Sequence, residues 1–244
     1  MCRHLAYLGT PITLHDLIAA PPHSLFRQSW APRRQRHGVV NADGFGAGWY
    51  VPDRVDPVRY RRAQPIWTDA SFASLAPTIA SPCILAAVRS ATVGLGRDEA
   101  CAAPFLHQRW LFSHNGRISD WPWSRKVLTE KTFDIPEAAA PVDSALLFGL
   151  AASRWSAGAG LAAGLFGMAE DVIQVGGGRL TSLAVDGTRI AGICIGEPLF
   201  VRASDDSVVV ASEPYDDDPG WTEVPDRTLI EADLRGVTIS PLPT

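Results

Sequence analysis

The second residue of the chain is a cysteine, in the opening stretch MCRHLAYLG. If Met1 is removed, Cys2 carries a thiol and a free α-amine on one residue. The amine titrates at about 7.7–8.0 and the thiol at about 8.5, so moving the proton from sulfur to nitrogen costs about 1 kcal/mol. Cys2 would then bring its own general base, as an N-terminal threonine does. The alternative is an early cysteine without a chemical role.

Attack by such a nucleophile creates an oxyanion, and two hydrogen-bond donors for it lie in SHNGRI (113–118). The side-chain amide of Asn115 and the backbone N–H of Gly116 are suited to a tetrahedral oxyanion, and losing one such donor typically costs about 3 kcal/mol. The alternative for the same two residues is a plain Asn-Gly hairpin turn.

Two further stretches supply charges for a substrate. In VRSATVG (88–94), Arg89 stands at the end of an apolar run and is followed by Thr92. A planar guanidinium binds both oxygens of a carboxylate, and a surface ion pair is the alternative role. In PVDSALLF (141–148), Asp143 stands where a helical pattern begins. We expect Asp143 to cap that helix, to receive a substrate ammonium group, or to do both.

The composition narrows the class of protein. A net charge of -4 argues against nucleic acid as the main partner, and the arginine-rich stretch 27–38 is expected to be a solvated loop. The sequence shows no apolar run long enough to cross a bilayer and no recognisable signal peptide, which favours a cytoplasmic location. The four cysteines lack CxxC spacing, so we expect reduced thiols and no zinc site. Cys83 and Cys194 lie in apolar runs and are expected to be buried.

Strand-like patterns dominate the elements that must position these residues. The alternation in residues 2–8 places Cys2 and His4 on one face and Arg3 on the other. Residues 179–196 read as a hairpin that turns at Asp186-Gly187. Further strands are expected at 45–51, 57–63, 83–89, 109–114, 208–212 and 228–232.

Helical patterns are fewer and cover 69–80, 143–155 and 159–175. Residues 121–142 are rich in proline and charge, so we expect an irregular surface segment there. Many strands with few helices predict an α+β layered fold with largely antiparallel sheets. The same pattern predicts a single domain over residues 1–244.

Together, the motifs resemble those of the class II glutamine amidotransferases, which are N-terminal nucleophile hydrolases. In that family a cysteine follows the initiator methionine, and an Arg-x-x-Thr-x-Gly stretch, an Asn-Gly turn and an aspartate follow in order. This chain matches the order with Cys2, Arg89 to Gly94, Asn115-Gly116 and Asp143. A closer resemblance, from residue 2 to about 235, is to the ergothioneine-pathway amidohydrolases. It rests on MCRHLAYLG, APRRQRHGVVNADGFGAGWY, ILAAVRSATVG, FSHNG and SEPYDDDPGW.

The resemblance implies a four-layer αββα fold with two antiparallel sheets. It also implies roles for the motif residues. Cys2 would be the nucleophile, and Asn115 with Gly116 the oxyanion hole. Arg89 and Asp143 would bind the α-carboxylate and α-ammonium of a glutamyl group, with Thr92 beside them. The implied reaction is hydrolysis of the γ-glutamyl amide of γ-glutamyl hercynylcysteine sulfoxide, a small-molecule substrate, with no metal and no other cofactor.

Alternative functions stay open from the sequence. A glutaminase subunit, or a hydrolase of other γ-glutamyl peptides, would need the same groups. A non-catalytic binding module of the same fold would keep Met1. Aromatic faces bind trimethylammonium groups such as that of hercynine, and the candidates are Trp30, Trp49, Trp121 and Trp123. The sequence does not predict the leaving-group specificity or the oligomeric state.

Overall fold

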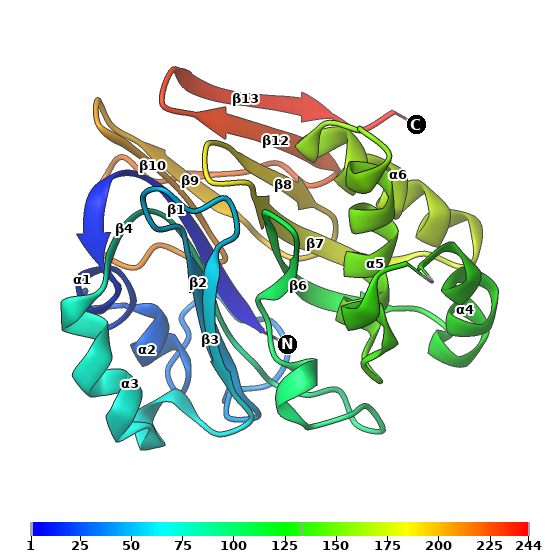
Figure 1. The fold of residues 1–244 in the computed structure, drawn as a ribbon, viewed down its shortest axis with the longest axis horizontal. Helices are drawn as coiled ribbons and strands as arrows, with labels where there is room; N and C mark the ends of the chain where they lie inside the picture. The colour runs from blue at the N-terminus through cyan, green and yellow to red at the C-terminus, as the bar shows by residue number, and fades with distance from the viewer. Residues whose placement is uncertain (1, 133, 244) are drawn as a thin grey trace.

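The computed structural model describes residues 2–132 and 134–243. These residues form two antiparallel sheets that lie face to face, with helices on the outer face of each sheet (Figure 1). The α+β class that the sequence patterns predict, and the four-layer αββα order that the resemblance implies, are therefore confirmed.

The first sheet contains seven strands in the part of the chain that the structure describes. In spatial order they are β11 (Thr222–Glu223), β9 (Phe200–Ala203), β10 (Ser207–Ala211), β1 (Arg3–Thr13), β4 (Ala80–Val88), β2 (Phe45–Trp49) and β3 (Val58–Arg62). β1 pairs with β10 on one side and with β4 on the other. Cys2, which precedes β1, therefore enters the middle of this sheet.

The second sheet contains six strands within the same described residues. Their order is β13 (Gly236–Pro241), β12 (Thr228–Asp233), β8 (Ile190–Cys194), β7 (Gly178–Val185), β6 (Trp110–Ile118) and β5 (Phe105–His107). β7 and β8 form the hairpin predicted at Asp186-Gly187. Its turn is closed by Asp186 Oδ1, which accepts the backbone N–H groups of Thr188 (3.0 Å) and Arg189 (2.9 Å).

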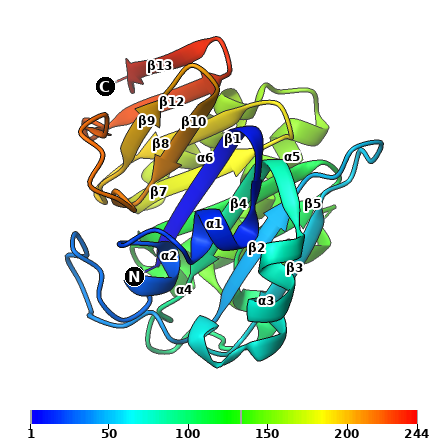
Figure 2. The ribbon, with the colours of Figure 1, turned by 90° about the vertical axis from the view of Figure 1, so that its left-hand side faces the viewer.

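The helices divide between the two outer faces. Near the first sheet lie α1 (Leu14–Ile18), α2 (Leu25–Gln28) and α3 (Ala70–Leu75), which Figure 2 shows in front of its strands. On the other side lie α4 (Trp121–Leu128), α5 (Asp143–Ser156) and α6 (Leu161–Gln174). Short 3-10 turns occupy Ile66–Thr68, Ala76–Thr78, Glu99–Cys101, Thr129–Thr132 and Pro136–Ala139.

The alternation predicted for β1 decides which layer each of its side chains joins. Leu5 and Tyr7 pack into the cluster beneath α1 to α3, whereas Ala6 and Leu8 pack into the cluster between the two sheets. A third cluster lies between the second sheet and α5 and α6. Burying a side chain such as Leu5 contributes roughly 1.5–3 kcal/mol, so the two-residue period holds β1 in this register.

The expectation of an irregular segment at 121–142 was wrong in part, because residues 121–128 form helix α4. Pro122 sits in the first turn, where it does not interrupt helical hydrogen bonds. The hydroxyl of Ser124 donates to the carbonyl of Ser119 (3.0 Å), and Leu128 is buried. This local hydrogen bond and the burial of Leu128 stabilise a helix that the composition of the segment does not indicate.

Some elements are shorter or more numerous than predicted. The pattern at 69–80 becomes α3, which ends at Leu75 and is followed by a 3-10 turn that contains Pro77. The prediction missed α1 and α2, which are only five and four residues long. It also missed β5, β9, β11 and β13, which are edge strands or next to an edge. Such strands bury fewer side chains, so their patterns are weaker.

Two further predictions concern membranes and thiols. Within the described residues, no helix combines the length and apolar character needed to cross a bilayer. Cys83 and Cys194 are buried as expected, and so is Cys101. All four cysteines are free thiols.

Candidate active site

Cys2 and Asn115 meet across the interface between the two sheets, although they are 113 residues apart. The backbone nitrogen of Cys2 donates to Oδ1 of Asn115 at 3.1 Å. Asn115 is fully buried on β6, and its Nδ2 atom has no hydrogen-bond partner among the described residues. One end of this amide therefore fixes the nitrogen of Cys2, while the other end remains available as a donor. Met1, whose removal the sequence leaves open, lies outside the described residues.

Gly116 adopts a backbone conformation that other residues avoid, with φ at 142°. A Cβ atom built there would lie 2.1 Å from the carbonyl oxygen of Arg179 and 2.9 Å from Cε1 of His114. Only glycine fits this close approach of β6 to β7. The peptide that carries the proposed second oxyanion donor is thus locked next to Asn115.

Arg89 lies one residue beyond β4 and is only 6% exposed. Its Nη2 donates to the carbonyl of Gly96 (2.7 Å) and its Nη1 to that of Asp43 (3.4 Å). The guanidinium is held by neutral carbonyls and forms no ion pair with a carboxylate among the described residues. The surface ion pair considered from the sequence is not formed there, and the positive charge stays available to a ligand.

Asp143 is the first residue of α5, whereas Val142 holds the N-cap position. The capping role expected from the sequence is therefore displaced by one residue. Asp143 is 4% exposed, and its carboxylate accepts the backbone N–H groups of Ile118 (3.2 Å) and Ser144 (2.9 Å). A carboxylate in the first turn of a helix is stabilised by the helix dipole.

A small cavity brings several of these elements together. Cys2 and Arg89 line it, together with His114 from β6 and Ser144, the neighbour of Asp143. Its other lining residues are Phe45, Ala87, Val88, Cys101, Ala103 and Phe105. Thr92 is not among them: it lies in the turn after Arg89, where its carbonyl accepts the N–H of Leu95 (3.1 Å).

Two buried histidines near this cavity were not singled out as site residues from the sequence. Nδ1 of His114 lies 3.2 Å from both the carbonyl oxygen of Thr181 and the hydroxyl of Ser182. Burial is the main cause that lowers the pKa of His114, and it lowers the pKa of His4 further, with Arg3 adding to the effect. Both imidazoles are therefore neutral at neutral pH. The signal in the sequence was the histidine directly before Asn115-Gly116.

A buried ion pair between Arg3 and Glu213 holds the backbone of Cys2 in place. Nε of Arg3 donates to the carbonyl of Cys2 (2.8 Å), and its Nη1 lies 3.8 Å from Oε2 of Glu213. Both side chains are fully buried. Glu213 also accepts the backbone N–H groups of Arg33 (2.9 Å) and Arg34 (2.7 Å). The pair thus links Cys2 to the arginine-rich stretch. The expectation of a solvated loop at 27–38 was wrong in part, because α2 extends to Gln28, and Gln28 and Ser29 are buried.

Asp43 and Asn41, to which the sequence assigns no role, organise the neighbouring loop. Oδ2 of Asp43 accepts the N–H of Ala91 (2.8 Å), which fixes the turn after Arg89. Asn41 is fully buried, and its Nδ2 donates to the carbonyl of Gln28 (2.9 Å).

The four tryptophans named from the sequence lie in different environments. Trp49 is only 8% exposed and belongs to the core beneath α1 to α3. Trp30 and Trp123 are exposed, and Trp121 lies beneath the guanidinium of Arg125. Trp30 meets Trp67 edge to face, with ring centres 5.7 Å apart.

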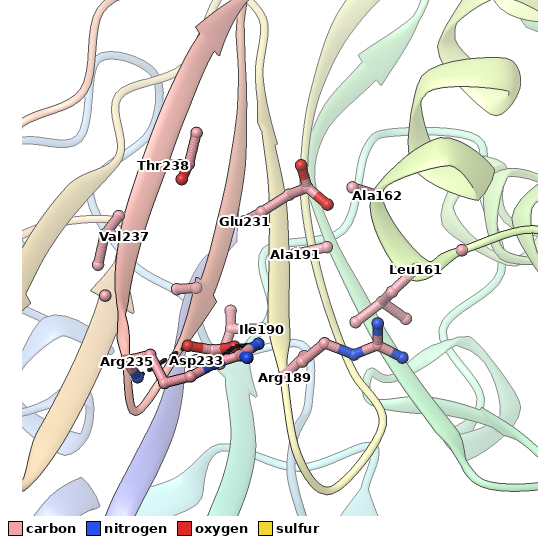
Figure 3. A pocket seen from close by; sticks show the side chains of 13 residues that line it. Leu161, Ala162, Arg189, Ile190, Ala191, Glu231, Asp233, Arg235, Val237 and Thr238 are labelled. Atoms are coloured by element: carbon pink, nitrogen blue, oxygen red, sulfur yellow. Dashed lines mark hydrogen bonds and ion pairs between the residues drawn. The ribbon is translucent and has the colours of Figure 1, made fainter.

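A larger hollow lies elsewhere, between the start of α6 and strands β8, β12 and β13 (Figure 3). Its charged side chains are mostly paired: Arg235 with Asp233 (2.7 Å) and Arg189 with Asp186 (3.0 Å). None of the residues predicted from the sequence to act in catalysis lines this hollow. We therefore place the candidate active site at Cys2.

Comparison with known proteins bears on this site. No protein-family model matches the chain. The γ-glutamyl-hercynylcysteine sulfoxide hydrolase of Mycolicibacterium smegmatis is 44% identical over 246 residues, covering 99% of this chain and all of that protein. The chain belongs to the γ-glutamyl-hercynylcysteine sulfoxide hydrolase family. A second member, from Mycobacterium tuberculosis, is 43% identical and covers 99% of this chain and 97% of that protein.

Solved structures agree with this family on the fold. A glutamine aminotransferase class-II domain protein from Silicibacter pomeroyi superposes with a TM-score of 0.72 at 24% identity, over the full length of both chains. This chain therefore shares the architecture of class II glutamine amidotransferases.

Proposed function

We propose that the chain hydrolyses the γ-glutamyl amide of γ-glutamyl-hercynylcysteine sulfoxide and releases glutamate and hercynylcysteine sulfoxide. The observation that carries this proposal is the contact between Cys2 and Asn115, in a chain that aligns over its whole length with hydrolases of that name. We propose further that residues 1–244 act as one domain, since this contact joins the two sheets.

Cys2 is the nucleophile in this proposal. After removal of Met1, the backbone nitrogen of Cys2 becomes an α-amine, which donates one hydrogen to Asn115 and uses its lone pair to take the thiol proton through a water molecule. The thiolate attacks the γ-carbonyl carbon, and the amide C–N bond breaks as the amine leaves with the proton held by the α-ammonium. Water then cleaves the thioester, with the same amine as base.

The surrounding groups stabilise charge at each end of the glutamyl group. The unpaired Nδ2 of Asn115 and the N–H of Gly116 donate to the oxyanion. Arg89, which has no carboxylate partner in the described structure, binds the substrate α-carboxylate, and Asp143 binds its α-ammonium. Thr92 follows Ala91, whose N–H is held by Asp43, and we propose that its hydroxyl contacts the glutamyl group when substrate is bound.

The first test asks whether Cys2 is an activated N-terminal thiol. Intact mass is measured before and after treatment with 6-diazo-5-oxo-norleucine, an electrophile that resembles glutamine. We expect a protein that lacks Met1 and gains one adduct on Cys2. Cys2→Ala should gain none, while Cys83→Ala, which changes a buried thiol, should react as the wild type does. Retained Met1 without an adduct would instead support a non-catalytic binding module.

The second test separates the substrates. Glutamate release is measured from γ-glutamyl-hercynylcysteine sulfoxide, glutathione and glutamine at equal concentrations. The proposal expects the highest kcat/KM for the sulfoxide. Faster turnover of glutamine would identify a glutaminase subunit, and faster turnover of glutathione a hydrolase of other γ-glutamyl peptides.

A further inference from the structure

Two arginines face each other at the open end of the β6–β7 pair. The register of these strands places Arg117 directly opposite Arg179. Both side chains line an open groove, together with Ser119, Asp120 and Gly178. Like charges directly opposite each other destabilise an antiparallel pair. A bound anion between them would remove that cost.

The groove lies on the same face of the sheet as Asn115. On β6, Leu111 packs between the two sheets and Phe112 packs toward α5 and α6, so odd-numbered residues of this strand face the first sheet. Asn115 and Arg117 therefore share the face toward Cys2. They are two residues apart, which corresponds to about 6.5 Å along a strand. Arg117, which lines the groove, is thus the next residue on this face of β6 after Asn115 of the proposed oxyanion hole.

The charges around the groove leave Arg117 free. Nε of Arg179 lies 2.7 Å from Oε1 of Glu197, a fully buried carboxylate that also acts on the buried Arg3. Arg117 is exposed and has no ion pair with any carboxylate of the described residues. Asp120 is the one acid that lines the groove beside the two guanidiniums. Because Glu197 already neutralises Arg179, the guanidinium of Arg117 is the group that suits an anionic ligand, with Arg179 beside it.

We propose that Arg117 and Arg179 bind the α-carboxylate of the amino acid that leaves when the γ-glutamyl amide is cleaved. This inference rests on the proposed function. In a γ-glutamyl amino acid, that carboxylate is attached to the carbon next to the amide nitrogen, so its oxygens lie within about 5 Å of the scissile carbonyl carbon. This reach matches the step from Asn115 to Arg117. Glutamine and γ-glutamyl amines lack the group, so the pair selects γ-glutamyl amino acids.

The test compares two substrates that differ only in this carboxylate, γ-glutamyl-S-methylcysteine and γ-glutamyl-S-methylcysteamine. We expect the wild type to prefer the carboxylated substrate by about 10- to 100-fold in kcat/KM, the range for a charge-assisted hydrogen bond. Arg117→Ala should lose most of that preference and change kcat/KM for the cysteamine substrate by less than about threefold. Arg179→Ala should lose the preference too, but it also leaves the buried Glu197 carboxylate without its partner and should lower kcat/KM for both substrates. Arg117→Lys keeps the charge but not the planar guanidinium, so its preference should lie between those of the wild type and Arg117→Ala.

The matched control is Arg235→Ala, because Arg235 pairs with Asp233 at the separate hollow of Figure 3. It should keep the full preference. The melting temperature of Arg117→Ala should equal or exceed that of the wild type, since the change removes a like-charge pair. A preference that persists in both alanine variants overturns the inference, and so does an equal loss on both substrates.

Wild-type activity on γ-glutamyl-hercynylcysteine sulfoxide is measured in parallel. If the wild type cleaves the sulfoxide but shows no preference for the carboxylated analogue, the inference fails and the proposed function stands. If the wild type cleaves none of the three compounds, the proposed function fails, and the inference falls with it.

Discussion

Nδ1 of His4 lies 3.0 Å from the hydroxyl of Ser113, a contact that joins β1, the middle strand of the first sheet, to β6 of the facing sheet. Both residues are completely or almost completely buried, and Nε2 of His4 has no partner among the described residues. The neutral imidazole of His4 and the hydroxyl of Ser113 thus form a buried polar contact between the two sheets. This arrangement makes the stability of the fold sensitive to pH.

We predict that stability falls as the pH drops from about 7 to 5. Burial lowers the pKa of both His4 and His114 in the folded state, while the unfolded chain binds protons near pH 6.5. Above pH 6.5 the two histidines are neutral in both the folded and the unfolded chain, so they do not lower the free energy of unfolding. Below it only the unfolded state gains protons, so each histidine removes up to about 1.4 kcal/mol per pH unit until its folded pKa is reached. Urea unfolding at several pH values measures the slope.

The matched variants for this prediction are His4→Gln and His37→Gln. The slope between pH 7 and 5 should become shallower in His4→Gln, whatever its absolute stability. His37 is exposed in the loop before β2, so His37→Gln should keep the wild-type slope. Equal slopes in all three proteins would show that His4 binds protons equally in both states.

Asn115→Ala should lower kcat by about 10²–10³, because it removes one donor to the oxyanion and the acceptor for the nitrogen of Cys2. KM should change little, since the glutamyl group is held by other residues. Steady-state glutamate release gives both constants, and circular dichroism checks the fold. A variant that loses affinity at unchanged kcat would place Asn115 in substrate binding instead.

Gly116→Ala should lower the free energy of unfolding by about 2–5 kcal/mol. The new methyl group would collide with the carbonyl of Arg179 and the backbone would remain at a φ that alanine disfavours. Gly158→Ala is the matched control, because Gly158 has φ at 94° with open space around it. It should cost only about 1–2 kcal/mol. Denaturant titration compares the two, and equal losses would refute the role of the close approach.

Alkylation should distinguish Cys2 from the other thiols. Burial raises the pKa of Cys194 to about 12 and also raises the pKa values of Cys83 and Cys101. Cys2 is half-buried and accessible. Iodoacetamide at pH 8 should therefore modify Cys2 alone in the native protein and all four cysteines in denaturant, as peptide mass mapping would show. Modification of Cys101 before Cys2 would contradict this account.

Much of the fold follows from local patterns in the sequence. The alternation of residues 2–8 predicts β1 and its two faces, and Asp186-Gly187 predicts the β7–β8 hairpin. The patterns at 143–155 and 159–175 predict α5 and α6 to within a few residues. These predictions hold because periodicity records which face of an element is buried. The site is different: the roles that the motif order suggests for Cys2, Arg89, Asn115-Gly116 and Asp143 stay a prediction.

The tertiary structure alone decides which side chains meet. No local pattern pairs Arg3 with Glu213, or sets Arg117 opposite Arg179. These contacts join residues far apart in the chain, and they depend on which strands become neighbours and in which register. That choice is made by packing of the whole core, because a shift of one residue would move every side chain of a strand to the opposite face of its sheet. The sequence therefore predicts a nucleophile at Cys2, and the packing of the two sheets places Arg117 opposite Arg179.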